Sequence, residues 1–404
     1  MDFSLKGIKV IQTAWAMAAP MTGRLLADWG ADVIWVEHPV RGDMFRSTLA
    51  RRGGKAIMSD IDYGAENNNR NKRGMTLDLS KEGAREILYK LLEKADVFLA
   101  NFRPRELTKF KVEYGTLSQL NLRLIYANLT GYGKRGPDKN FPALEHTGYF
   151  CRSGIEHVLR QPGSPPVVTP LGMGDHVAGM ALALGIMAAL FVRERTGMGQ
   201  EVDVSLLSAG VYTLSFDIAG ALVTGQDRQQ VDRKEITNAI SAFYETKDGR
   251  WLRLGMTTPD PYWSRFCQAI EREDLEHDPR FESFEPRTNN HAALFSILEK
   301  VFLSKTLEEW KVILNEKGLL WGPVQSLPEI IADPQARAND LFVPFDHPTY
   351  GRIELVTSPV KLSKTPASIR MPAPELGQHT EEILLEHGYT WKDIEQFKEQ
   401  AAIA

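Results

Sequence analysis

The sequence predicts an α/β protein with a large domain built on a parallel sheet and a smaller α+β domain. Short apolar strands alternate with helical segments over roughly the first 130 residues, as in a parallel sheet covered by helices. Residues 238–254 differ, because two strand-like pieces flank a turn at Lys247–Gly249 and helical segments follow to about Leu320. This change of pattern predicts the second domain.

Length and composition restrict the class of protein. The 404 residues, 43% of them hydrophobic, are enough for sizeable cores in two or three domains. The net charge of −4, with both signs mixed along the chain, argues against a nucleic-acid partner. No signal sequence is present and the apolar run Met180–Val192 is too short to cross a bilayer, so we expect a cytoplasmic protein that does not bind membranes. Cys151 and Cys267 form neither a disulfide framework nor a zinc pattern.

The first forty residues predict a Rossmann-like βαβ unit that lacks the usual phosphate-binding turn. A strand at Val10-Ile11, a helix at Met21–Trp29 and a strand at Ala31–Val36 form this unit. The turn after the first strand reads AWAMAAP instead of the glycine-rich fingerprint, which argues against a dinucleotide-dependent dehydrogenase. Pro20 suits the first turn of a helix. Glu37 is either a ribose ligand or a structural strand end.

Polar and basic residues cluster beside several predicted strands. Strands are expected at 97–100 and 124–129, and a polar loop follows each of them. Open parallel sheets bind ligands beyond the carboxyl ends of their strands, and guanidinium and ammonium groups suit phosphates. The clusters together indicate an anionic ligand, whereas any one alone is usually a solvated turn. The residues concerned are Asn71, Lys72, Arg73, Asn101, Arg103, Lys109, Lys134 and Arg135.

The segment Leu171–Leu207 is the most informative, because it places one carboxylate at the start of a long apolar helix. Gly172 and Gly174 allow the backbone to turn sharply and to approach a ligand closely. The carboxylate, Asp175, either caps the helix by accepting its first free N–H groups or reacts with a substrate. His176 beside it is either a structural histidine or a base.

Seven segments in a fixed order resemble the class III CoA-transferase family, and they extend from Ala18 to Leu384. One such segment alone is a weak signal, whereas seven in the family's order are highly specific. The matching segments are AAPMTGRLLADWGADVIWVEHPVRGD, NRNKRGMTLDL, ANFRP, RLIYANLTGYGKRGP, GMGDHVAGM, TGMGQEVDVSLL and PAPELGQHTEEIL.

The resemblance implies a domain organisation that periodicity alone does not. It implies an α/β fold with a Rossmann-like large domain, a smaller α+β domain and an intertwined, ring-like homodimer. The expected divisions are residues 1–220 for the first part of the large CoA-binding domain, 221–237 for a linker, 238–329 for the small domain, and 330–404 for a second linker and a return to the large domain.

The resemblance also implies the chemistry. Its substrates are an acyl-CoA and a small carboxylic acid, with coenzyme A carried as a thioester and no metal required. Asp175 is implied as the nucleophile that forms an anhydride and then an aspartyl-CoA thioester, and Glu145 as the residue that orients the acyl or acceptor carboxyl group. The residues implied around CoA are Gln12, Trp15, Ala16, Arg41, Asn71, Lys72, Arg73, Asn101, Phe102, Arg103, Lys109 and Lys134.

Two alternatives within the family remain open. Racemases resembling alpha-methylacyl-CoA racemase have a His-acid pair where Leu144 and Glu145 stand here, and leucine carries no proton. A transferase of the crotonobetainyl-CoA:carnitine type is the other alternative. The segments GPDKNFPALEHTGYF and VVTPLGMGDHVAGM favour members that act on 2-hydroxy acids such as 2-hydroxyisocaproate or phenyllactate. Leu144 also favours a larger apolar acyl group over a small polar one.

The segment Gly255–Trp263 replaces a glycine-rich loop that covers the aspartate in formyl-CoA transferase. Its prolines would stiffen it, and bulky side chains such as Met256 and Tyr262 would then shield an anhydride from water. An ordinary strand-to-helix connection explains the segment equally well.

Overall fold

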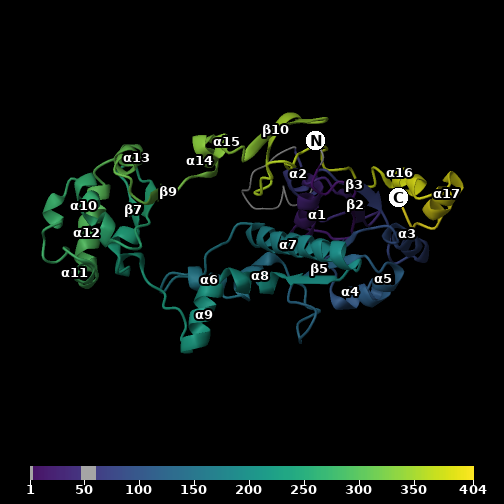
Figure 1. The fold of residues 1–404 in the computed structure, drawn as a ribbon, viewed down its shortest axis with the longest axis horizontal. Coiled ribbons are helices and arrows are strands. Elements are labelled where there is room, and N and C mark those ends of the chain that lie inside the picture. The colour runs from purple at the N-terminus through teal and green to yellow at the C-terminus, as the bar shows by residue number, and fades with distance from the viewer. Residues whose placement is uncertain (1–2, 47–60) are drawn as a thin grey trace. The chain divides into compact units, whose positions relative to one another are not determined.

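The structure is a computed structural model that describes residues 3–46 and 61–404 (Figure 1). The chain forms two compact units, each with its own sheet and its own hydrophobic core. The first unit comprises the chain up to Leu159 together with Val167–Gln226 and Arg337–Ala404. The second unit comprises Arg160–Pro166 and Asp227–Ala336.

A six-stranded parallel sheet organises the first unit, with the strand order β3-β2-β1-β4-β5-β6. This arrangement confirms the predicted Rossmann-like α/β fold. The direction of strand order reverses between β1 and β4, and the crevice beyond the carboxyl ends of such strands is where open sheets bind ligands. The strands are β1 (Lys9–Gln12), β2 (Asp32–Glu37), β3 (Arg73–Thr76), β4 (Val97–Ala100), β5 (Ile125–Thr130) and β6 (Glu201–Ser205).

The strands read as continuous apolar runs because both faces of the sheet are covered. Val10 of β1 and Leu99 of β4 face one core, while Ile11 and Phe98 of the same strands face the other. Helices α1 (Ala18–Asp28), α7 (Met173–Thr196) and α8 (Leu206–Thr213) contribute to the first core. Helices α3 (Glu82–Leu92) and α5 (Tyr114–Leu120) contribute to the second.

Helix α7 is longer than the apolar run that the sequence suggested. It has 24 residues, and by length and composition alone the whole helix would suffice to cross a membrane, as the core helix of a soluble protein also can. The prediction concerned only the shorter run Met180–Val192 inside it. Its small residues pack against α1 inside the core. A Cβ atom at Gly179 would lie 2.5 Å from the carbonyl oxygen of Ala18, so the close approach of the two helices requires glycine there.

The C-terminal residues complete the second core of the first unit. Helix α16 (Thr380–Glu386) lies against β3, and α17 (Trp391–Glu399) follows it, both drawn in yellow in Figure 1. Ile383, Leu384 and Ile394 are fully buried there. The remaining elements of this unit are α2 (Tyr63–Asn69), α4 (Pro104–Phe110), a π-helix (His146–Cys151), α6 (Ile155–Leu159), α9 (Ser215–Thr224) and the antiparallel pair β10 (Phe342–His347) and β11 (Gly351–Val356).

The second unit is a small α+β fold. Its three antiparallel strands are followed or joined by helices whose aromatic residues fill the core, as predicted for Trp263, Phe302 and Trp310. Met256 is also fully buried in this core, so the expectation that it shields the active site is wrong. The strands and α-helices are β7 (Phe243–Glu245), β8 (Trp251–Leu254), α10 (Asp260–Ala269), α11 (Phe284–Asn289), α12 (His291–Phe302), α13 (Leu307–Glu316), β9 (Trp321–Pro323) and α14 (Leu327–Ala332), with α15 (Pro334–Ala338) after them. Short 3-10 helices lie at Arg233–Glu235, Ala239–Ser241 and Glu273–Leu275.

The burial of α16 predicts unequal effects of two neighbouring leucines. Leu384→Ala removes a fully buried side chain and should lower the free energy of unfolding by about 2–5 kcal/mol. Leu385→Ala removes a side chain that is 38% exposed and should change it by less than about 0.5 kcal/mol. Urea unfolding of both variants measures the difference, and equal effects would contradict the docking of α16 described above.

Candidate active site

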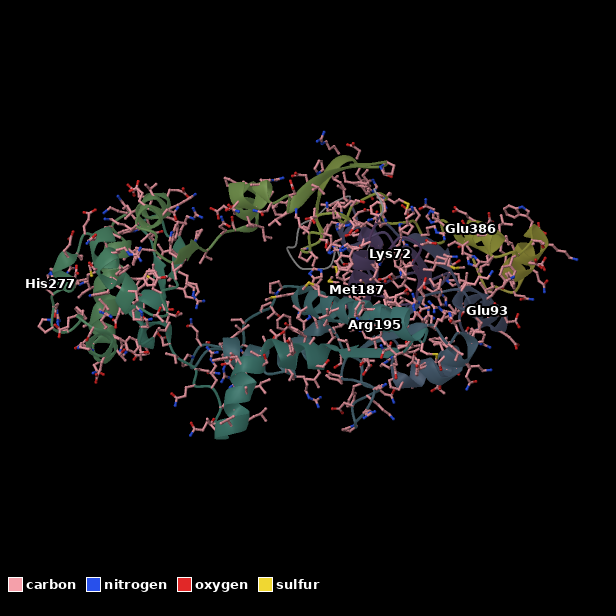
Figure 2. The ribbon with its side chains drawn as sticks, viewed as in Figure 1. Lys72, Glu93, Met187, Arg195, His277 and Glu386 are labelled. Atoms are coloured by element: carbon pink, nitrogen blue, oxygen red, sulfur yellow. The ribbon has the colours of Figure 1, made fainter. Side chains whose placement is uncertain are left out.

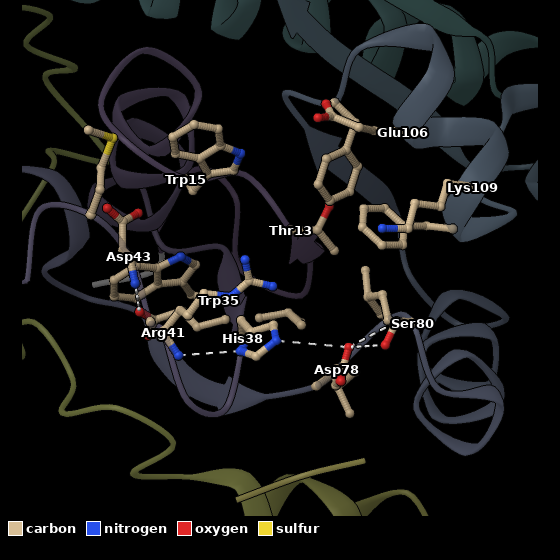
Figure 3. Close-up of a pocket in the computed structure, with 18 residues that line it drawn as sticks. Thr13, Trp15, Trp35, His38, Arg41, Asp43, Asp78, Ser80, Glu106 and Lys109 are labelled. Carbon is tan, nitrogen blue, oxygen red and sulfur yellow. Dashed lines mark hydrogen bonds and ion pairs between the residues drawn. The ribbon is translucent and has the colours of Figure 1, made fainter. Parts of the chain in front are cut away.

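Two adjoining cavities lie beyond the carboxyl ends of the strands in the first unit. The larger, of about 590 Å³, is lined by residues that follow β1, β2, β3 and β4 (Figure 3). The smaller, of about 140 Å³, contains Asp175 and shares Trp15 and Glu106 with the larger one. The crevice predicted from the strand order therefore holds a large compartment and a small one, with Asp175 in the small one.

Seven of the twelve residues predicted to surround CoA line these cavities. The loops after β1 and β4 carry most of them, because the two strands are adjacent and parallel. The larger cavity is lined by Trp15, Arg41, Phe102 and Lys109, and the smaller by Trp15, Ala16, Asn101 and Arg103. Arg103 pairs with Glu106, so part of its charge is already compensated within the wall.

Lys72 does not reach either cavity, contrary to its predicted role. Its ammonium nitrogen Nζ is buried and donates to the carbonyl oxygens of Pro20 and Asn68 and to Oδ1 of Asn69, each within 2.8 Å. Figure 2 places Lys72 inside the first unit. Burial lowers the pKa of Lys72 well below its usual range. The lysine therefore ties α1 to α2 instead of holding a phosphate.

Asn71 and Arg73 are likewise used within the fold. Asn71 has a left-handed backbone (φ 63°), and its side-chain amide donates to Asp28 and to the carbonyl oxygen of Ser368. Arg73 forms ion pairs with Asp32, at 2.8 Å, and with Glu386, at 2.7 Å. Both residues join the C-terminal segment to the sheet and lie outside the two cavities.

Gln12 and Lys134 are also absent from the cavity walls. Gln12 is fully buried at the end of β1, where its side chain donates to the carbonyl oxygen of Ala14. Lys134 pairs with Glu201 at 2.5 Å. With Asn71, Lys72 and Arg73, these two complete the five predicted CoA ligands that we leave out of the site.

Glu145 caps helix α7. Its carboxylate accepts hydrogen bonds from the backbone N–H groups of Gly172, Gly174 (2.8 Å) and Asp175 (3.2 Å). These are the free donors at the start of a helix. Glu145 is 1% exposed and does not line the smaller cavity, so the expectation that it orients a substrate carboxyl group gives way to a structural role.

The cap leaves the Asp175 carboxylate without a hydrogen-bonding partner among the residues that the structure describes. Asp175 is half-buried in the first turn of α7 and lines the smaller cavity. Burial raises the pKa of Asp175 to about 7, and the nearby Glu145 carboxylate adds to the rise. An unpaired carboxylate in such a place is a candidate nucleophile.

His176 is a poor candidate for a second proton-transfer group. Burial, followed by the charge of Arg24, lowers the pKa of His176 to about 4. Its buried Nε2 atom has no partner among the described residues. A histidine with this pKa is neutral and only weakly basic at pH 7, which favours the structural interpretation.

Part of the lining of the smaller cavity is apolar. Phe141, Pro142 and Leu144 line the smaller cavity together with Leu129 and Leu206. Leu144, which separates this chain from the racemase pattern, therefore contributes surface for an apolar acyl group. No group of three or more His, Cys, Asp or Glu residues is placed to hold a metal ion within residues 3–46 and 61–404.

Helix α1 points its N-terminus at the same cavity. Met17 and Ala18, at its start, line the cavity, and the side chain of the N-cap residue Met17 makes no capping hydrogen bond. The first N–H groups of a helix favour negative charge, so this end of α1 suits an oxyanion that forms near Asp175. The helix predicted at Met21–Trp29 is present, but it begins three residues earlier, at Ala18.

Sequence reasoning missed several residues of the larger cavity. Trp35, His38, Asp43 and Ser80 line it, and none of them was proposed as a ligand. The rule that ligands lie beyond strand ends also applies to β2 and β3, and it would have found His38 and Ser80. Asp43 had no local signal, because its position depends on how the chain folds back after β2.

The fold and the site define an α/β protein with a half-buried carboxylate in the smaller of two adjoining compartments. The family model described as CoA-transferase family III matches residues 5–380, and the chain belongs to this family. The chain is therefore a CoA-transferase, whose substrates are CoA thioesters.

Curated relatives and solved structures match almost the whole chain. The (R)-2-hydroxy-4-methylpentanoate CoA-transferase of Clostridioides difficile is 35% identical over 99% of each chain. The cinnamoyl-CoA:phenyllactate CoA-transferase of Clostridium sporogenes is 34% identical over 98% of this chain and 96% of its own. The crystal structure of a CAIB/BAIF family protein from Brucella suis has a TM-score of 0.83 and 26% identity, covering 96% of this chain and all of that one.

The raised pKa of Asp175 predicts a pH profile. A carboxyl group with a pKa of about 7 is mostly protonated at pH 6 and mostly ionised at pH 8. If the carboxylate is the reactive form, kcat/KM for the acyl-CoA should rise with pH and reach half its plateau near pH 7. A profile that is flat from about pH 5 to 8 would contradict this prediction.

The cap gives a second prediction. Glu145→Gln removes a negative charge beside Asp175 and leaves one oxygen to accept the N–H groups at the start of α7. The midpoint of the pH profile should therefore fall, on the order of one unit, while the free energy of unfolding drops by about 1–3 kcal/mol. Glu113→Gln, at the start of α5 where no side-chain cap is formed, is a matched control that should change neither.

Proposed function

We propose that the protein moves CoA from an acyl-CoA donor to a 2-hydroxy acid, with Asp175 as the covalent carrier. The observation that carries this proposal is the half-buried Asp175 carboxylate in the smaller cavity, which has no hydrogen-bonding partner among the described residues. The names of the two bacterial relatives, which contain 2-hydroxy-4-methylpentanoate and phenyllactate, support the acceptor class. The apolar wall of the cavity supports a branched or aromatic acid.

The first half of the reaction loads CoA onto Asp175. A carboxylate oxygen of Asp175 attacks the thioester carbonyl carbon, and the C–S bond breaks to release CoA thiolate and leave a mixed anhydride. The thiolate then attacks the Asp175 carbonyl carbon of the anhydride. The C–O bond breaks, the donor acid leaves as a carboxylate, and an aspartyl-CoA thioester remains.

The second half repeats these steps with the acceptor. The acceptor carboxylate attacks the aspartyl-CoA carbonyl carbon, and the C–S bond breaks to release CoA thiolate and form a second mixed anhydride. The thiolate attacks the acceptor's carbonyl carbon, which yields the new acyl-CoA and regenerates the Asp175 carboxylate. Each addition passes through an oxyanion, and we assign its stabilisation to the N-terminus of α1 near Met17 and Ala18.

The larger cavity is the proposed site for the nucleotide part of CoA. Its volume of about 590 Å³ is in the range of ligand pockets. Trp15, which is 44% exposed, offers aromatic surface, and Arg41 and Lys109 offer positive charge for phosphates. The smaller cavity then receives the acyl group, because Trp15 lines both compartments.

We further propose a cytoplasmic homodimer. Several apolar side chains of α7 and α9 are exposed in the single chain, among them Phe216 (90%) and Leu222 (82%). Patches of this kind mark association surfaces. The intertwined arrangement expected from the family resemblance would cover them, and CoA thioesters are intracellular substrates. Sedimentation of the purified protein tests the dimer, and a monomer at micromolar concentration would contradict it.

Mass spectrometry of a donor and acceptor screen tests the proposed function. Branched, aromatic and short polar acyl-CoA esters are mixed with 2-hydroxy acids, and new 2-hydroxyacyl-CoA is the expected product. Hydroxylamine should convert Asp175 to a hydroxamate only when an acyl-CoA is present. Asp175→Asn should lower kcat by at least about 1,000-fold and abolish the hydroxamate, whereas Asp393→Asn, in α17, should do neither.

Three outcomes would contradict parts of this proposal. Transfer to other acids but not to 2-hydroxy acids would reject the acceptor class and keep the carrier. Transfer without a hydroxamate, and with activity retained in Asp175→Asn, would reject the carrier. Hydrogen exchange at the alpha carbon without any transfer would move the chain to the racemase-like alternative.

A further inference from the structure

The turn Thr13–Met17 forms the wall between the two cavities. Thr13 lines only the larger cavity, Ala16 and Met17 line only the smaller, and Trp15 lines both. The shape of each compartment therefore depends on the backbone of this turn. The turn follows β1 directly, in the place where a glycine-rich phosphate loop would stand in a dinucleotide-binding protein.

Side chains from neighbouring strand ends hold the polar groups of this turn. Asn101, after β4, accepts from the N–H of Trp15 at 3.2 Å and donates to its carbonyl oxygen at 2.7 Å. The indole nitrogen of Trp35, on β2, donates to the carbonyl oxygen of Ala14 at 3.3 Å. These contacts hold the backbone of the turn up to Trp15. They do not include the next residue, Ala16, whose N–H group is bound by a different side chain.

Asp43 provides that support at the strained position of the turn. Ala16 has φ 67°, a left-handed conformation that residues with a side chain rarely adopt. Oδ2 of Asp43 accepts the N–H of Ala16 at 2.9 Å, and its Oδ1 accepts the N–H of Phe45 at 2.8 Å. The Asp43 side chain lines the larger cavity, so it reaches the wall of the Asp175 cavity from the CoA side (Figure 3).

Asp43 is in turn held in place by Glu37, which also binds Arg46. Glu37, at the end of β2, accepts the N–H of Asp43 at 3.0 Å and binds the guanidinium of Arg46 through both its oxygens. The Arg46 guanidinium lies over the Trp35 ring, 4.6 Å from its centre. Asp43 is 3% exposed, so its two backbone contacts are made in a desolvated place where hydrogen bonds to a charged group are strong.

We propose that Asp43 is a positioning residue that holds Ala16 in its left-handed conformation and thereby sets the wall that separates the CoA cavity from Asp175. This inference rests on the proposed function, because the two cavities are assigned to CoA and to the acyl group. Asp43 touches no reacting atom. It acts through Trp15 and Met17, whose places in the smaller cavity follow from the Ala16 backbone.

The proposal predicts an effect on turnover more than on CoA binding. In Asp43→Asn, one oxygen has to replace two, so either Ala16 or Phe45 loses its acceptor. A small displacement of reacting groups can reduce the rate by roughly 100-fold. We expect kcat to fall about 10- to 100-fold, with KM for the acyl-CoA changed less than about threefold, because the aromatic and basic walls of the larger cavity remain.

The Ala16→Gly substitution separates this role from a general loss of stability. Glycine adopts a positive φ without strain, so the turn keeps its shape without the Asp43 contact. The factor by which Asp43→Asn lowers kcat should therefore be at least fivefold smaller in the Ala16→Gly background than in the unmodified enzyme. A fivefold ratio of rates corresponds to roughly 1 kcal/mol. Thermal unfolding of each variant is followed in parallel.

Asp96→Asn is the matched control. Oδ2 of Asp96 accepts the N–H of Lys9 at 2.7 Å, at the opposite end of β1 from the cavities. The Asp96→Asn substitution removes the same charge and weakens a contact to a backbone N–H in the same unit, and it also weakens the ion pair of Asp96 with the buried Arg193 at 2.8 Å. We expect lower thermal stability with kcat unchanged. Equal penalties of Asp43→Asn with and without Ala16→Gly would overturn the proposal, and so would a raised KM with unchanged kcat, which would make Asp43 a CoA ligand.

Failure of this inference is distinguishable from failure of the proposed function. The unmodified enzyme reports on the function through the hydroxamate at Asp175 and the transfer products. If the unmodified enzyme gives the hydroxamate and the transfer products, the Asp43 variants test only whether the turn Thr13–Met17 needs the Asp43 contact. Slower hydroxamate formation in Asp43→Asn, restored by Ala16→Gly, supports the proposal, whereas unchanged formation overturns it.

Discussion

The cap that Glu145 places on helix α7 is the interaction on which the site depends. The N-terminus of a long helix needs acceptors for its free N–H groups, and an aspartate in the first turn is a common solution. Here Glu145 accepts the N–H groups of Gly172, Gly174 and Asp175, so the Asp175 carboxylate is not needed for that purpose. It turns to the cavity instead. Burial raises the pKa of Asp175, and the Glu145 carboxylate that this cap brings close to it adds to the rise.

The sheet supplies the second constraint. The reversal of strand order between β1 and β4 opens a crevice, and the loops after these strands supply Trp15, Asn101 and Phe102. A dinucleotide-binding fold would place glycines in the first loop to admit a pyrophosphate. This chain fills that position with a turn whose polar groups are held by Asn101, Trp35 and Asp43. The crevice is consequently divided, with room for a large ligand on one side and a small apolar group on the other.

Local patterns were sufficient to predict the parallel sheet and to single out Asp175. Apolar runs such as Val97–Ala100 predicted their strands because both sheet faces are covered. Asp175 lies at a cavity, and so does Trp15, which only the family resemblance implied. Lys72 looked like a phosphate ligand because sequence does not reveal that backbone carbonyls surround it. The cap formed by Glu145 spans 27 residues or more, and the support from Asp43 also spans 27, so no local pattern contains either.

The site combines two opposing requirements. Burial and the Glu145 charge make the Asp175 carboxylate more basic, and a more basic oxygen is the better nucleophile once ionised. The same effects reduce the ionised fraction at pH 7 to about half, a penalty of only about twofold in rate. A carboxylate with an ordinary pKa near 3.9 would be fully ionised at pH 7 but less reactive, because solvent would stabilise its charge. In the proposed mechanism, a pKa of about 7 therefore leaves about half of the Asp175 side chains ionised at pH 7, and no hydrogen bond from the described residues lowers the nucleophilicity of the carboxylate.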